Sequence, residues 1–310
     1  MLLARIKDRV AEERGRFSTL ILGTTAAYLF MGVAAAVAWS ATGQTAWIEY
    51  FFQIPGALLL VWLAVAEMAL GIRVWRCFGA GEPLRRAWLF IVCSSASAVL
   101  GYLYSQLLGV SSKLNPLSHM SNPSPALIQR MRELGLLLGG TVRFAFLAAG
   151  LSCVLALYRR SGFMGRLRRR DWLLLGALAV YLVVEYGDVL VALRAGTRFS
   201  LSTILGWPVD PLLWLLMGEA LLIVRSVQKT GLGWIGRCWA AFSVAIFLTV
   251  LGDVGLLATA YDYIPWPLSA VTWFIWMPAA AAFALGPAYQ LEAIQMASGE
   301  LPERRRWGNS

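Results

Sequence analysis

The sequence has little charge and few of the residue types that most enzymes use in catalysis. Of its 310 residues only 14% are charged, one is histidine, three are lysine and four are cysteine, whereas 59% are hydrophobic. A soluble domain has about 45–50% apolar and roughly 25% charged residues. This composition excludes an ordinary soluble domain and predicts an integral membrane protein.

The scarce residue types also exclude several kinds of cofactor chemistry. Lys7, Lys113 and Lys229 lie outside the centres of the long apolar stretches, so a retinal Schiff base is not expected. Transmembrane haem b needs axial ligands, normally histidine, and His119 lies in the long loop 110–133, to which the sequence assigns no role. Zinc spacing, P-loop, dinucleotide-binding and nucleophile-elbow motifs are absent. We therefore expect no cofactor, no metal and no enzyme activity.

Eight stretches are long and apolar enough to cross a bilayer as helices. A hydrocarbon core of about 30 Å needs roughly 20 mostly apolar residues per helix. The stretches are 19–40, 55–76, 87–109, 134–158, 172–193, 210–228, 238–259 and 266–290. They predict an all-α polytopic membrane protein with eight transmembrane helices, the first of which is retained because no convincing cleavage site follows it.

Basic residues concentrate in alternate connecting segments. Of the 27 Lys and Arg residues, 21 lie within 1–18, 73–86, 159–170, 225–237 and 304–306. Because basic loops stay in the cytoplasm, we expect both termini to be cytoplasmic. The 24 Arg against three Lys indicate a GC-rich bacterial genome, and therefore a bacterial inner membrane. Topology explains the net charge of +10, so nucleic acid is not an expected partner.

The two halves of the chain are similar in sequence. LILGTTAAYL (20–29) matches LLLGALAVYL (173–182) at six of ten positions. Trp62, Glu67 and Arg73 match Trp214, Glu219 and Arg225 at an offset of 152 residues. The pattern predicts a tandem duplication of a four-helix unit, whose parallel halves are related by an axis along the membrane normal. Chance similarity between leucine-rich helices is the alternative.

The matches define the expected domain organisation. We divide the chain into a basic N-terminal segment (1–18), a first repeat (19–160), a basic linker (161–171), a second repeat (172–296) and a C-terminal tail (297–310). Anionic lipid headgroups are the expected partner of the linker, at about 1 kcal/mol for each basic residue near the surface. The linker residues expected to contact them are Arg166, Arg168, Arg169 and Arg170.

Six ionisable residues fall inside the predicted spans, where a charge costs about 2.5–3.5 kcal/mol. They are the candidate ligand- or ion-binding residues: Glu67, Glu219, Arg143, Glu185, Asp188 and Asp253. Counting the helix rise from the span ends places Glu67 and Glu219 near the midplane and the other four in the outer half. If the repeats face each other, Glu67 and Glu219 form a coupled pair that shares one proton. Otherwise, each is neutral or bonded and fixes helix packing.

A buried arginine needs a partner, because an unpaired guanidinium is costly. Asp253, Asp188 and Glu185 are the expected partners of Arg143, since they lie at similar depth. Together these residues predict an outward-facing polar cavity between the repeats, which binds an ion, an anionic headgroup or a small metabolite. A purely structural ion pair is the alternative. The nearby Gly135-x-x-x-Gly139 motif predicts close helix packing.

Three classes of function remain, of which transport or binding of a small solute or ion is our preferred interpretation. The second class is a sensor, because residues 172–296 resemble multi-span input modules of bacterial signalling proteins. The resemblance depends on a Gly-Asp pair late in one span and a tryptophan in the next: Gly187-Asp188 before Trp214, and Gly252-Asp253 before Trp273. It implies a separate cytoplasmic partner. The third class is a structural subunit of a membrane complex.

Overall fold

The computed structural model describes residues 16–44, 46–107, 133–197, 199, 204, 206–230, 233–260 and 271–297. These residues are almost entirely helical and include no strand, which confirms the predicted all-α class. The helices are α2 (Arg16–Thr42), α3 (Ala46–Phe51), α4 (Ala57–Cys77), α5 (Pro83–Tyr102), α8 (Arg143–Arg160), α9 (Arg169–Arg194), α11 (Val209–Thr230), α12 (Gly233–Ala260) and α13 (Val271–Ala297). Three π-helical segments accompany them: η1 (Phe52–Gly56), η2 (Leu103–Leu107) and η3 (Leu138–Val142).

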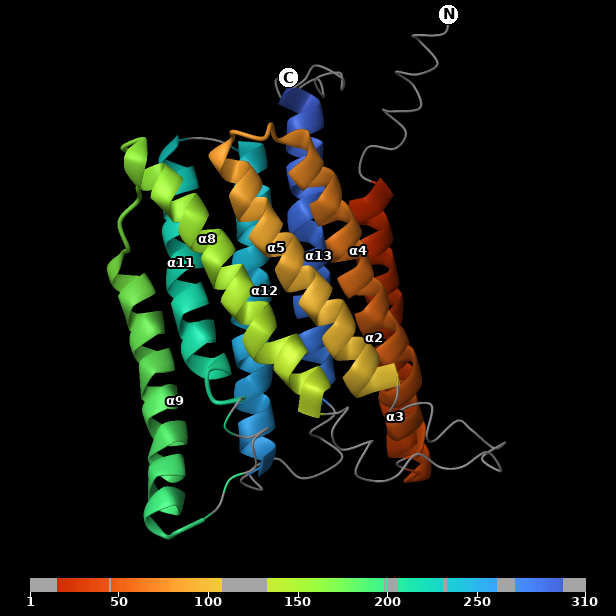
Figure 1. Ribbon diagram of the computed structural model, residues 1–310. Helices are drawn as coiled ribbons and strands as arrows, with labels where there is room; N and C mark the ends of the chain where they lie inside the picture. Colours follow the sequence, from red (N-terminus) through yellow and green to blue (C-terminus); the bar gives the residue numbers. More distant parts are fainter. Residues whose placement is uncertain are drawn as a thin grey trace, which may run out of the picture.

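The long helices run in alternating directions. Helix α2 begins and α13 ends at the same end of the bundle, where the connections α4–α5 and α8–α9 also lie (Figure 1). We call this the upper end and the opposite one the lower end. Glycine helps to terminate α8 at the upper end, because Gly162 has a φ of 72°, a left-handed conformation that side chains disfavour.

Six helical stretches are long and apolar enough to cross a membrane, so the chain is a membrane protein. They are Arg16–Thr42, Ile54–Cys77, Pro83–Ser105, Glu133–Arg160, Arg169–Arg194 and Gly236–Gly255. Large apolar side chains are exposed on the outer helices, such as Phe30 on α2 and Val183 on α9, as a surface in contact with hydrocarbon requires. The other two predicted spans, 210–228 and 266–290, fall on α11 and, in their described part, on α13.

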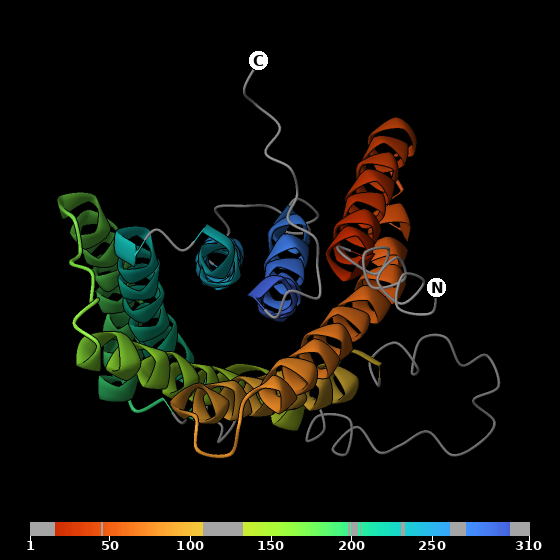
Figure 2. The same cartoon turned by 90° about the horizontal axis from the view of Figure 1, so that it is seen from above.

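Six helices pack side by side in a closed ring. Its order is α4, α5, α8, α11, α12 and α13, and α13 returns to α4. Helix α2 packs outside the ring on α13, and α9 packs outside it on α11. Seen from above, α12 and α13 stand inside the curve that the other helices form (Figure 2).

Four buried aromatic residues fill the middle of the ring. Phe242 contacts the other three. The centroid of its aromatic ring lies 6.4 Å from that of Trp88, 5.9 Å from that of Trp239 and 6.2 Å from that of Phe283. All four are less than 4% exposed. We call these residues the aromatic cluster, and they join α5, α12 and α13.

Glycines allow α5 and the helix before α8 to touch backbone to backbone. A Cβ atom on Gly101 would lie 2.4 Å from the amide nitrogen of Gly139, and one on Gly135 would lie 2.7 Å from that of Ser105. No larger residue fits at such distances. The prediction of close packing at Gly135 and Gly139 is therefore confirmed.

Several predicted features lie outside the described residues. They include most of the loop 110–133 with His119, the terminal segments 1–15 and 298–310, and the beginning of the last predicted span. The side chains of Glu185 and Asp188 on α9 are also outside the description.

Candidate functional site

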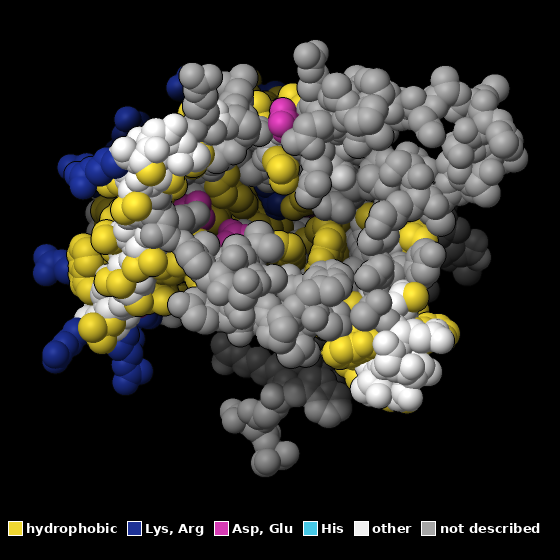
Figure 3. Space-filling view, turned by 90° about the horizontal axis from the view of Figure 1, so that it is seen from below, with side chains coloured by type: hydrophobic (Ala, Val, Ile, Leu, Met, Phe, Trp, Pro, Cys, Tyr) yellow, Lys and Arg dark blue, Asp and Glu magenta, His cyan; other side chains and the backbone are white. Residues whose placement is uncertain are grey.

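A cavity of about 400 Å³ opens within the ring toward its lower end, and we call it the lower cavity. Helices from both halves of the chain line it, including α4, α5 and α8 from the first half and α11, α12 and α13 from the second. Figure 3 views the lower end and shows a hollow whose visible walls are mainly hydrophobic, with acidic and basic side chains among them. Its lining includes Tyr102, Arg143, Asp253, Trp273 and Trp276.

Arg143 is the charged group most tightly held in this wall. Its side chain is 4% exposed, and its Nη2 atom lies 3.3 Å from Oε2 of Glu67, whose side chain is 2% exposed. Nη1 donates a hydrogen bond of 2.5 Å to the hydroxyl of Tyr102. The guanidinium also lies 4.4 Å from the ring centroid of Phe283, where the face of the ring attracts a cation. These three contacts compensate for removing the charge from water.

The pair is not fully satisfied by its protein partners. Nε of Arg143 and Oε1 of Glu67 are both buried and have no hydrogen-bond partner among the described residues. Buried polar atoms are nearly always bonded in folded proteins. Arg143 therefore retains unused donor capacity beside the lower cavity.

Two π-helical segments lie next to the polar residues of the cavity. Tyr102 immediately precedes η2, and Arg143 immediately follows η3. A π-helical turn inserts an extra residue into the helix and rotates the following side chains, and such turns are frequent at functional sites. Neither segment was predicted from the sequence. Consecutive Gly139 and Gly140 shortly before Arg143 are the sequence feature that accompanies η3, whereas no pattern indicates η2.

The partner of Arg143 differs from the three that we expected. Its described ion pair is with Glu67, whereas the side chains of Asp188 and Glu185 lie outside the described residues. Depths counted along straight α-helices misled the prediction, because they ignore the π-helical turns and the reach of an arginine side chain. Asp253 does share the cavity with Arg143, although the two form no described ion pair.

The expected coupled pair of Glu67 and Glu219 is not formed. Ser152 donates a short hydrogen bond to Oε1 of Glu219, and Oε2 of Glu219 is buried without a partner among the described residues. Both glutamates contact α8, but at Arg143 and at Ser152, which are nine residues or about 13.5 Å of helix apart. Each carboxyl group therefore has its own environment.

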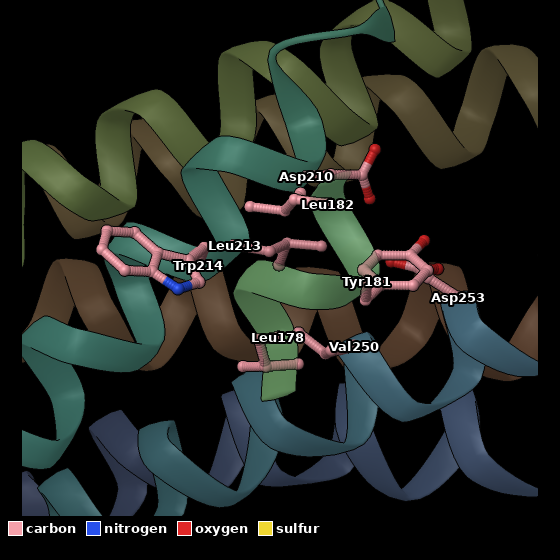
Figure 4. Close-up of a pocket in the computed structure, with 8 residues that line it drawn as sticks. All are labelled: Leu178, Tyr181, Leu182, Asp210, Leu213, Trp214, Val250 and Asp253. Atoms are coloured by element: carbon pink, nitrogen blue, oxygen red, sulfur yellow. The ribbon is translucent and has the colours of Figure 1, made fainter. Parts of the chain in front are cut away.

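Asp253 also borders a second, much smaller space between α9, α11 and α12. Figure 4 shows the Tyr181 ring beside the Asp253 carboxyl group, with Asp210 further along the cleft. The free volume is only about 10 Å³, which is close to the minimum for one water molecule. This cleft is too small for an organic ligand, so the lower cavity is the candidate site.

The basic linker lies at the upper end. Its four predicted lipid contacts, Arg166, Arg168, Arg169 and Arg170, are all exposed. Gly165 holds the linker against α11, since its amide donates a 2.8 Å hydrogen bond to Ser226. The described residues contain no cluster of three or more potential metal ligands.

Comparison with known proteins finds no match to this chain: no protein-family model fits the sequence, and no curated protein or solved structure is similar to it. The function must therefore be inferred from the residues of the site.

Proposed function

We propose that this protein transports a small organic anion across a bacterial inner membrane through the lower cavity. The main support is Arg143, a buried guanidinium in the wall of a space of about 400 Å³. Small-molecule sites typically have about 300–1,000 Å³ and combine apolar walls with few polar groups. A guanidinium is the side chain best suited to a carboxylate or phosphate. The ligand would place its anionic group at Arg143 and its apolar body against Trp273 and Trp276.

Glu67 gives this site a way to link anion binding to a proton. In the structure its carboxylate pairs with Arg143, so an incoming anion competes with Glu67 for the guanidinium. When Glu67 takes up a proton, the positive charge of Arg143 becomes available to the ligand. Anion and proton would then bind together, and the net charge of the site would remain unchanged from the empty state.

We also propose that all eight predicted spans cross the membrane as two parallel tandem repeats. The order of the helices around the ring supports this. The second, third and fourth long helices of the first half (α4, α5 and α8) are followed by the second, third and fourth of the second half (α11, α12 and α13). Trp88 and Trp239 are separated by 151 residues and pack with ring centroids 6.3 Å apart. Equivalent residues in mutual contact are expected on a pseudo-twofold axis.

A second pair of contacts supports the same relation. A Cβ atom on Gly150 would lie 3.0 Å from the side chain of Ile91, and one on Gly286 would lie 2.5 Å from that of Phe242. Ile91 and Phe242 are again 151 residues apart. The contact between the third and fourth helices of each half is therefore built in the same way.

For orientation, we propose that the upper end faces the cytoplasm. The basic segments 73–86 and 159–170, and the described part of 225–237, lie at its connections. The exposed linker arginines would contact anionic headgroups there.

Uptake by purified protein in liposomes tests the transport proposal. We expect a panel of monocarboxylates of increasing apolar size to include substrates whose uptake increases with an inward proton gradient. Arg143→Gln should abolish this uptake, whereas Arg225→Gln, which removes an arginine of the upper end, should retain it. Anion binding without flux would favour the sensor, and failure of every anion to bind would contradict both.

A further inference from the structure

A second cavity, of about 220 Å³, lies at the upper end of the ring, and we call it the upper cavity. It is bounded where α5 begins and α8 ends, by residues that include Leu84 and Ser161. Tyr158 and Gln290 also line it. None of the described side chains that line it is charged, in contrast to the lower cavity with Arg143 and Asp253.

Two buried polar atoms in this wall have no hydrogen-bond partner among the described residues. Nε1 of Trp88 is a donor on a residue that is 0% exposed, and Oε1 of Gln290 is an acceptor on a residue that is 7% exposed. Both residues line the upper cavity. Because such atoms are nearly always bonded, the site is complementary to an uncharged group that offers one acceptor and one donor.

The aromatic cluster lies between the two cavities. Phe283 lines the lower cavity, Trp88 and Trp239 line the upper one, and Phe242 contacts all three. Trp88 and Trp239 also mark the proposed pseudo-twofold axis. The two cavities therefore lie at opposite ends of one line through the ring, separated by apolar rings that a charged group would not cross easily.

We infer that the upper cavity binds the uncharged carboxylic acid form of a solute whose anionic form binds in the lower cavity. A protonated carboxyl group has the required pair of atoms: its carbonyl oxygen accepts from Trp88 and its hydroxyl donates to Gln290. The proton would move from the protonated carboxyl of Glu67 to the carboxylate of the solute. Glu67 then becomes the anion that pairs with Arg143, so charge and atoms balance.

This inference rests on the proposed function in its choice of a carboxylic acid, but occupation of the upper cavity is testable by itself. Two variants with one added cysteine serve as reporters, Ser161→Cys for the upper cavity and Ser105→Cys for the lower one, since both residues line their cavities. Labelling by a maleimide is read on the peptide that contains the new cysteine, so the native cysteines remain. The probes are benzoate at neutral pH and a series of neutral primary amides from acetamide to naphthamide.

We expect neutral amides to slow labelling at position 161 and benzoate to slow it at position 105. Trp88→Phe or Gln290→Leu should weaken protection at 161 by about fivefold to tenfold, as for a lost buried hydrogen bond. Neither change should alter benzoate protection at 105, and Gln295→Leu, on the same helix but outside the cavity lining, should change neither.

The two reporters separate the possible failures. If no amide protects position 161, or if Trp88→Phe and Gln290→Leu leave that protection unchanged, the upper cavity contains only water and the inference is wrong. If benzoate fails to protect position 105 while the amides protect 161, the upper site exists and the anion site of the proposed function is wrong.

Discussion

Glu67 and Glu219 occupy matching positions in the two halves, yet they have different partners. Glu67 pairs with Arg143 at 3.3 Å, whereas Glu219 accepts a hydrogen bond from the Ser152 hydroxyl. A carboxyl group with a hydroxyl partner and no described counter-charge is least costly in an apolar interior when it is uncharged. The same residue type therefore belongs to an ion pair in one half and accepts a hydrogen bond from a hydroxyl group in the other.

The difference extends to the helices around the two glutamates. All three described π-helical segments lie in the first half, and two of them flank the polar residues of the lower cavity. The second half contributes α11, α12 and α13 to the same cavity, and Asp253 as its charged residue. The two halves thus differ in their charged groups, and among the described residues the buried guanidinium lies only in the first.

Replacing Glu67 or Glu219 should give the largest difference in stability between the two halves. Glu67→Gln leaves Arg143 charged and unpaired, which should lower the free energy of unfolding by about 3–5 kcal/mol. Glu219→Gln keeps an acceptor for Ser152 and should cost less than about 1 kcal/mol. Thermal unfolding of the two variants in the same detergent measures both effects.

The double variant Glu67→Gln/Arg143→Gln is the control for this contrast. It removes both charges and should recover most of the lost stability, because the cost lies in the uncompensated guanidinium. An added monocarboxylate should also stabilise Glu67→Gln by mass action, but not the double variant. Equal losses in Glu67→Gln and Glu219→Gln would show that the ion pair has no special role.

The sequence predicted the membrane-spanning character of the chain well, because a bilayer demands about 20 apolar residues per helix. The span predicted at 172–193 lies within α9 (Arg169–Arg194), and that at 19–40 lies within α2 (Arg16–Thr42). The cost of intramembrane charge also identified Arg143, Glu67 and Asp253 as residues that require an explanation. These predictions depend on composition, which a sequence states directly.

The partners of the site residues could not be predicted from composition and helix length. The pairing of Glu67 with Arg143 depends on η3 and on glycines that bring helices together, and neither follows from apolar periodicity. The cavities and the aromatic cluster depend on the order of helices in the ring, which no span prediction contains. The serine partner of Glu219 was equally unpredictable, because many serines in apolar helices bond to their own backbone, as Ser243 does.

A smaller effect should distinguish the environment of Glu219 from that of a free surface carboxyl. Ser152→Ala removes its donor and leaves both carboxyl oxygens buried without a partner, which should cost about 1–2 kcal/mol. In a Glu219→Leu background the same serine change should have almost no effect, since nothing remains to be bonded. A cost for Ser152→Ala that is equal in both backgrounds would contradict the proposed hydrogen bond.

The smallest effects are expected at the upper end, where the halves differ at another matching pair. Arg225 makes hydrogen bonds of 2.6 and 2.9 Å to the carboxylate of Asp171 at the start of α9, whereas Arg73 lies over the ring of Phe17 at the start of α2. Asp171→Asn should lower stability by about 1 kcal/mol, as for a partly exposed ion pair. Phe17→Leu should lower it by roughly 0.5 kcal/mol, as for an exposed cation–π contact.

The salt dependence of the two stability losses distinguishes the contacts more clearly than the magnitudes of the losses do. High ionic strength screens a partly exposed ion pair, so the effect of Asp171→Asn should shrink in concentrated salt. The effect of Phe17→Leu should change less, because burial of the ring against the arginine stem contributes to it as well. Thermal unfolding at low and high salt provides the measurement. If both effects respond equally to salt, the two arginines stabilise the first helix of each half by the same kind of interaction. The two halves would then be more alike at this end than their contacts indicate.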